Sequence, residues 1–224
     1  MGRESLQDSS PGTAGPDAVG PHGDAGDAAL TPPERGVERD AAIDALLAVA
    51  PFPGWTMPAL CRAAGPDADL LFPGGAADLV EAFVDLTDRR TVEGAAGLGL
   101  ESMRVPARVR ALIAERLRQA RPHREAVGRA VGMLAGSPAL AARCTARTVD
   151  AIWFAAGDTA ADLSWYTKRL ILAGVYGTTL LVWVGDRSAD DAATLAFLDR
   201  RLGDVRRIGR LRQALTLRRR TSRG

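Results

Sequence analysis

The stretch LILAGVYGTTLLVWV, from Leu170 to Val184, is the most hydrophobic part of this 224-residue chain. It contains two glycines and two threonines. A membrane-spanning helix needs about 20 apolar residues, more than this stretch offers. We expect it to form most of a helix over about 162–184 that is apolar nearly all round, which is typical of the central helix of a bundle.

The segments on both sides repeat apolar residues at helical spacing. Thr56 is a predicted N-cap for a short helix that ends near Gly65, and a longer helix is expected to end near Arg90. The glycine-rich piece 94–99 is a predicted loop. Prolines 106, 122 and 138 are expected to open three further helices. The stripes are Ile43, Leu46, Leu47, Ala50; Leu79, Val80, Phe83, Val84; Val109, Leu112, Ile113, Leu117; Val149, Ile152, Trp153, Ala156; and Leu195, Leu198, Leu202, Val205, Ile208. Strand-like alternation is not seen in the sequence, so the predicted fold class is all-α.

Charge is unevenly distributed although the net charge is only +2. Residues 1–38 are rich in glycine, proline and acidic side chains, with little apolar surface to bury, and we predict a disordered acidic tail there. Arginines dominate residues 200–224, where Asp204 is the single acid. Any anionic lipid is therefore expected to meet the C-terminus.

Candidate catalytic or metal-binding groups are sparse. Cys61 and Cys144 lack metal-ligand spacing and are expected to be buried thiols in a reducing compartment. His22 and His123 are the only histidines, so a zinc site is not expected. Asp150 and Asp158 lack the additional ligands that a carboxylate metal site needs. The sequence predicts no cofactor and no catalytic residues.

Residues 54–84 read as a helix, a turn, a short helix, the step Phe72-Pro73 and a long amphipathic helix. This order resembles the DNA-binding head of the TetR regulators. A recognition helix needs polar and basic side chains, but the segment 66–71 is short and carries Asp67 and Asp69, which would repel phosphates. We therefore expect no specific nucleic-acid binding.

A second resemblance rests on several motifs that occur in order. They are LFPGG (71–75), PHREAV (122–127), RTVDAIW (147–153), AGDT (156–159), SWYTKR (164–169) and FLDRR (197–201). Together they resemble the ubiquinone-biosynthesis accessory family, the mitochondrial coenzyme Q lipid-binding protein and its alphaproteobacterial relatives. The resemblance implies a TetR-like fold with N-terminal helices over 39–92, a lipid-binding helical core over 93–208 and a basic segment over 209–224.

The same resemblance implies a function without catalysis. The chain would bind an isoprenoid quinone intermediate or a phospholipid and present it to a di-iron demethoxyubiquinone hydroxylase. The implied docking patch is the region of Asp162, Trp165 and Tyr166, with Lys168 and Arg169 beside it. From the residues alone, one of Trp165 and Tyr166 could equally pack at the edge of the core while the other is half-exposed. The alternative function is a ligand-responsive TetR-type transcriptional regulator.

The lipid pocket is predicted on the two most apolar helices. Gly174 and Gly177 would open a cavity beside the backbone there, although glycines that let two packed helices approach explain the pattern equally well. The candidate lipid-binding residues are Ile152, Trp153, Leu172, Val175, Tyr176, Thr179, Leu180 and Trp183.

The C-terminal segment repeats apolar residues among arginines, which is typical of a helix on an anionic membrane surface. A solvated, frayed tail would carry the same residues. The candidate membrane-contact residues are Ile208, Arg210, Leu211, Arg212 and Leu215. We expect a homodimer in the cytoplasm, peripheral on the inner face of a bacterial membrane.

Overall fold

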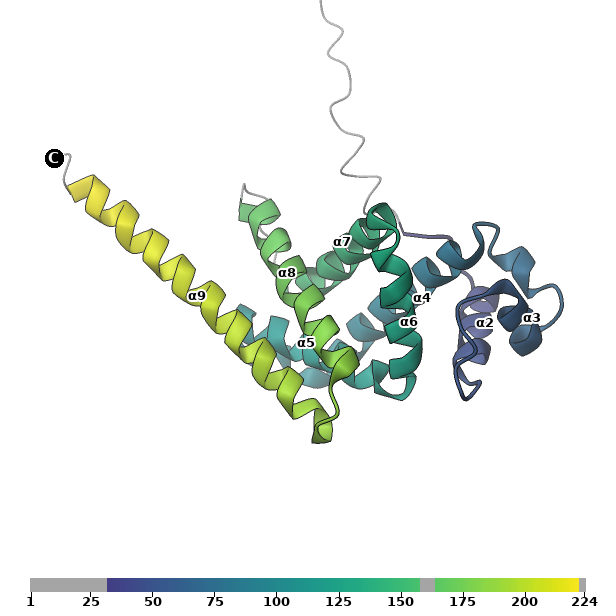
Figure 1. Ribbon diagram of the computed structural model, residues 1–224. Coiled ribbons are helices and arrows are strands. Elements are labelled where there is room, and N and C mark those ends of the chain that lie inside the picture. Colours follow the sequence, from purple (N-terminus) through teal and green to yellow (C-terminus); the bar gives the residue numbers. More distant parts are fainter. Residues whose placement is uncertain (1–31, 158–163, 222–224) are drawn as a thin grey trace, which may run out of the picture.

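The computed structural model describes residues 32–157 and 164–221, with side chains over 32–157 and 166–207. Every regular element in these two ranges is a helix, as predicted (Figure 1). None of the described helices is both long and apolar enough to cross a membrane. Residues 1–31 of the predicted acidic tail lie outside the described part of the chain. The predicted boundary at 38 is too late, because helix α2 begins at Val37 and Arg35 pairs with Asp85 at 2.6 Å.

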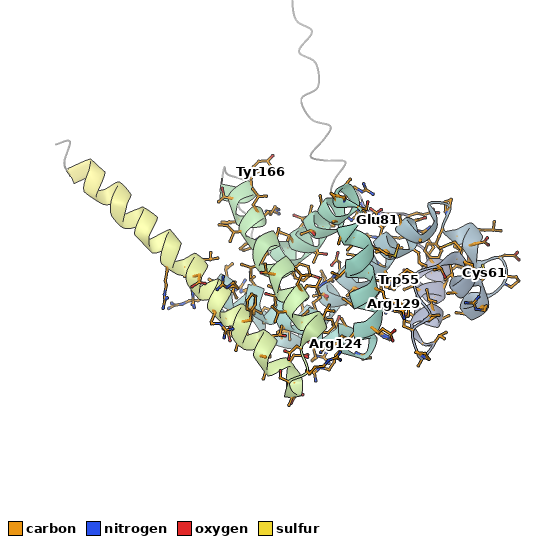
Figure 2. The ribbon with its side chains drawn as sticks, viewed as in Figure 1. Trp55, Cys61, Glu81, Arg124, Arg129 and Tyr166 are labelled. Atoms are coloured by element: carbon orange, nitrogen blue, oxygen red, sulfur yellow. The ribbon has the colours of Figure 1, made fainter. Side chains whose placement is uncertain are left out.

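The N-terminal helices are α2 (Val37–Leu47) and α3 (Met57–Ala64), followed by the single 3₁₀ turn η1 (Ala68–Leu71). The predicted cap is confirmed, since the Thr56 hydroxyl accepts a hydrogen bond from the Ala59 amide across 3.3 Å. Trp55 is buried and its indole N–H donates to the Ala126 carbonyl across 2.8 Å. This bond ties the segment before α3 to α6 (Arg124–Ala135), which lies far along the chain (Figure 2).

Helix α4 (Gly75–Gly94) is longer than predicted. It continues past Arg90 to Gly94, and its last turn lies against Gln119, whose side-chain amide donates to the Arg90 carbonyl across 3.2 Å. The loop predicted over 94–99 is instead the last residue of α4 and the 3₁₀ turn η2 (Ala95–Leu98). A Cβ at Gly94 would lie 2.5 Å from Nε2 of Gln119, so the glycine lets α5 (Val105–Ala120) approach closely.

The 3₁₀ turn η3 (Leu100–Ser102) precedes the next three helices, which are α5 (Val105–Ala120), α6 (Arg124–Ala135) and α7 (Pro138–Ala155). The 3₁₀ turn η4 (Arg121–His123) lies between α5 and α6. Pro106 and Pro138 lie in the first turns of α5 and α7, as predicted. Pro122 lies in η4, one turn before α6 begins. The three helices pack with α4 around one hydrophobic core.

Helix α8 (Ser164–Gly185) was expected to be enclosed on all sides, and that expectation is wrong. Leu172, Val175 and Trp183 pack into the core, but Leu170 and Leu181 are 75% and 62% exposed on another face. The described helices cover only one side of α8. Packing in the core therefore does not account for the apolar residues on the exposed face of α8, and exposed apolar patches of this kind commonly mark interaction sites.

Helix α9 (Ala192–Thr221) follows the 3₁₀ turn η5 (Ala189–Asp191) and extends beyond the other helices (Figure 1). The carboxylate of Asp186 caps its start, accepting hydrogen bonds from the Thr194 amide and hydroxyl across 2.8 and 2.5 Å. These bonds, with those from the Ser188 amide and hydroxyl, lower the pKa of Asp186. The single carboxylate thus fixes the turn between α8 and α9.

Candidate functional site

A small cavity lies among helices α4 to α8. Its volume is about 70 Å³, room for a few water molecules. Most of the wall is apolar. The lining residues are Phe83, Val84 and Thr87 of α4; Arg116, Leu117 and Ala120 of α5; Val127, Ala130, Val131 and Leu134 of α6; Cys144, Thr145 and Thr148 of α7; and Tyr176 and Leu180 of α8.

One corner of this cavity is polar. Nε of Arg116 donates to the hydroxyl of Tyr176 across 2.8 Å, and Nη1 lies 2.6 Å from Oδ1 of Asp88. The hydroxyl of Thr148 donates to Oδ2 of the same carboxylate across 3.1 Å. All four residues are buried. The side chains of α4, α5, α7 and α8 therefore meet in one group joined by two hydrogen bonds and an ion pair, called here the polar corner.

Burial affects the ionisable groups around the cavity. It raises the pKa of Asp88 to about 6, although Arg116 and Thr148 act in the opposite direction. Burial also raises the pKa of the Cys144 thiol to about 11. At neutral pH the thiol is protonated and acts as a small apolar wall residue. Cys61, also expected to be buried, is only half-buried.

The structure divides the predicted lipid-binding residues into two groups. Tyr176 and Leu180 line the cavity. The remaining ones pack elsewhere in the core, fully buried except for the half-buried Trp153; they are Ile152, Trp153, Leu172, Val175, Thr179 and Trp183. A Cβ at Gly174 or Gly177 would meet no described atom within 4 Å, and neither glycine lines this cavity, so among the described residues they neither widen it nor admit a neighbouring helix.

Most of the cavity wall comes from helices that sequence reasoning did not assign to a pocket. A signal was present, because Phe83, Val84 and Thr87 follow helical spacing, as do Val127, Ala130, Val131 and Leu134. Helical spacing identifies a buried face, but it does not say which buried faces leave space between them. Arg116 is the residue whose role was least visible, since it lies among other arginines in the sequence.

The predicted docking residues lie at the start of α8, and only some are described. Tyr166 is 67% exposed at the end of α8 remote from Arg124 (Figure 2). The Lys168 amine lies 6.0 Å from the centre of the Trp153 ring, and Arg169 pairs with Asp150 of α7. Asp162 and the Trp165 side chain lie outside what the structure describes.

An apolar strip continues along α8 from Tyr166. It consists of the exposed residues Tyr166, Leu170, Ile171, Leu181 and Val182 and is called here the α8 outer face. The predicted membrane-contact residues follow in α9, whose backbone is helical to Thr221. Their side chains, from Ile208 to Leu215, lie outside what the structure describes.

Two comparisons with known proteins bear on this arrangement. The COQ9 family model matches residues 139–209, which include nearly all of α7, all of α8 and the first part of α9. The mitochondrial ubiquinone biosynthesis protein COQ9-A of Xenopus laevis is 32% identical over 182 residues, 75% of this chain and 57% of that protein. Both comparisons support the COQ9 family.

Other COQ9 proteins match in the same way. COQ9-B of Xenopus laevis is 30% identical over 181 residues, 75% of this chain and 62% of that protein. The COQ9 of Rattus norvegicus is 48% identical over 61 residues, 27% of this chain and 20% of its own length. This chain therefore spans about three fifths of the two Xenopus laevis proteins. These relatives are mitochondrial proteins of animals, and the alphaproteobacterial origin expected for this chain stays a prediction.

Proposed function

We propose that this chain is a COQ9-type accessory protein of ubiquinone biosynthesis that binds a lipid and carries out no catalysis itself. The observation that carries the proposal is the similarity to ubiquinone biosynthesis proteins over 75% of the chain. The cavity among α4 to α8 supports the lipid-binding part, because its wall is apolar and has a single polar corner.

The cavity has to expand to hold an isoprenoid. Ligand sites commonly enclose about 300–1,000 Å³, whereas this cavity has about 70 Å³. Leu134 and Leu180 line it and are only partly buried, so they can move without breaking the core. We expect a bound isoprenoid to displace such side chains and to leave the polar corner in place.

A partner and a second copy of the chain would share the α8 outer face. The end that carries Tyr166 and Leu170 would dock the di-iron demethoxyubiquinone hydroxylase, since exposed aromatic and apolar side chains are typical interface anchors. The end that carries Leu181 and Val182 would join α9 in a homodimer. The arginine-rich part of α9 would make a reversible electrostatic contact with anionic lipids on the inner face of the membrane.

The test is native mass spectrometry of the purified chain, combined with organic extraction and analysis of the extract. We expect a quinone, isoprenoid or phospholipid to copurify at no more than one molecule per chain. A protein that is empty and also refuses added lipid would refute the lipid-binding proposal, and the α8 outer face would then be its main functional feature.

A further inference from the structure

The polar corner contains a donor that the described residues leave without an acceptor. The Tyr176 hydroxyl oxygen accepts the bond from Nε of Arg116, so its own proton has to point elsewhere. Within the described part of the chain no group accepts that proton. Tyr176 is 6% exposed and lines the cavity. Leaving a buried hydroxyl proton unbonded is unfavourable, and a ligand oxygen in the cavity would supply the missing acceptor.

The hydroxyl is also held in position. Arg116, which is 5% exposed, is fixed by its ion pair with Asp88 on α4, and that carboxylate is in turn bound by Thr148 on α7. A donor that is already oriented loses little conformational freedom when it binds a ligand. Arg116 and Tyr176 therefore form a preorganised pair rather than two flexible side chains.

Charge balance determines the kind of oxygen that fits. The carboxylate of Asp88 lies 2.6 Å from Arg116 and neutralises the guanidinium. Arg147, a second cation whose charge acts on Asp88, is paired with Glu81 at 2.5 Å. A carboxylate or phosphate headgroup would therefore add an anion next to Asp88 where both nearby arginines already have a carboxylate partner, which is costly in a buried site. An uncharged carbonyl oxygen can accept from the hydroxyl without that cost.

We propose that the polar corner is a headgroup subsite, in which Tyr176 donates a hydrogen bond to an uncharged carbonyl oxygen of an apolar ligand such as a quinone. Fatty acids and phospholipids are disfavoured there by Asp88. The proposal rests on the proposed function, in that it needs an apolar ligand inside the cavity. It adds the class of headgroup and the residues that select it.

The experiment measures the affinity of the full chain for three probes with similar alkyl tails: a decyl-substituted benzoquinone, decylbenzene and dodecanoate. Binding is followed by equilibrium dialysis at neutral pH. The variant Tyr176→Phe removes only the hydroxyl, and Tyr166→Phe is the matched control, because Tyr166 is exposed on the same helix. Thermal melting of both variants checks that they fold.

We expect the wild-type chain to bind the quinone more tightly than decylbenzene or dodecanoate. Tyr176→Phe should weaken quinone binding about three- to tenfold, the effect of one hydrogen bond, and leave decylbenzene unchanged. Tyr166→Phe should change neither. Infrared spectra provide a second readout that needs no variant: the carbonyl band of the bound quinone should shift to lower frequency than in an apolar solvent.

The outcomes separate the two proposals. If decylbenzene and the quinone bind equally and Tyr176→Phe changes neither, the cavity holds apolar ligands but the headgroup subsite is refuted. Tighter binding of dodecanoate than of the quinone refutes the charge argument and the subsite with it. If no probe binds the wild-type chain, the headgroup subsite is refuted, and the lipid-binding function is decided separately by native mass spectrometry.

Discussion

Arg116 of α5 and Asp88 of α4 form a buried ion pair, with Nη1 of the arginine 2.6 Å from Oδ1 of the aspartate. Both side chains are less than a tenth exposed. Removing one partner leaves the other charge buried and unpaired, which typically costs about 3–5 kcal/mol. We therefore expect Asp88→Ala to lower the free energy of unfolding by an amount in this range, measured by urea denaturation.

The double variant Asp88→Leu/Arg116→Met is the control for that experiment. Apolar residues of similar volume often replace a buried ion pair at little cost, so we expect it to recover at least half of the lost stability. If the single variant is as stable as the wild-type chain, the pair is not buried as described.

The stability should also depend on pH through Asp88. Its pKa is raised to about 6 from the ordinary 3.8, so the folded chain holds the proton more tightly than the unfolded chain. The stabilisation from this carboxyl is fully present below pH 3.8 and is lost as pH rises through about 6. We therefore compare the free energy of unfolding of the wild-type chain with that of Asp88→Asn. The wild-type chain should gain stability relative to the variant as pH falls from 7 towards 4.5. A constant difference would contradict the raised pKa.

Asp186 has the opposite role, because it is stabilising when ionised. Its carboxylate accepts four hydrogen bonds from Ser188 and Thr194 at the start of α9. We expect Asp186→Ala to cost about 1 kcal/mol, the usual effect of losing an N-cap, seen as a lower melting temperature. Arg187→Ala, one residue along and exposed, should change stability by less than about 0.5 kcal/mol. Equal effects of the two variants would argue against the cap.

The α8 outer face can be tested with two matched substitutions. Leu170→Glu and Leu181→Glu each place a charge on an exposed position, so neither should lower the melting temperature substantially. We expect Leu170→Glu to weaken binding of the hydroxylase in a pull-down and Leu181→Glu to weaken the homodimer in size-exclusion chromatography with light scattering. If both variants lose the same property, one partner covers the whole face.

The two thiols should react at different rates with a disulfide reagent at pH 8. Cys144 is buried and its pKa is about 11, so its thiolate fraction at that pH is on the order of 0.1%. We expect Cys61, which is half-buried, to react first. Because Cys144 lines the cavity, a bound lipid should slow its reaction further and leave Cys61 unchanged. Mass spectrometry of the single variants Cys61→Ser and Cys144→Ser measures each rate.

Much of the helical structure could be predicted, because helix signals are local. The Thr56 cap and the prolines that open α5 and α7 act within one turn of the chain, and the structure confirms them. The end of α4 was predicted too early, because its last turn lies against Gln119 of α5 and such contacts between helices leave no local pattern.

The candidate site was harder to predict for the same reason. Helical spacing showed that Tyr176 and Leu180 face inward, but buried packing and cavity lining give one and the same pattern. Arg116 and Tyr176 are separated by 60 positions in the chain, and no sequence pattern links them. The exposed α8 outer face was missed because Leu170 and Leu181 are leucines, a residue type that usually lies in a core.

The sequence by itself determined the helical class, the approximate helix positions and, through its ordered motifs, the resemblance to the ubiquinone-biosynthesis accessory family. Only the tertiary structure decided which apolar faces enclose a cavity, which one is left to solvent, and that Asp88, Arg116, Thr148 and Tyr176 meet in one corner. The physical reason is that helix formation depends on neighbours three or four residues apart, whereas a cavity depends on how five helices, α4 to α8, are placed around it.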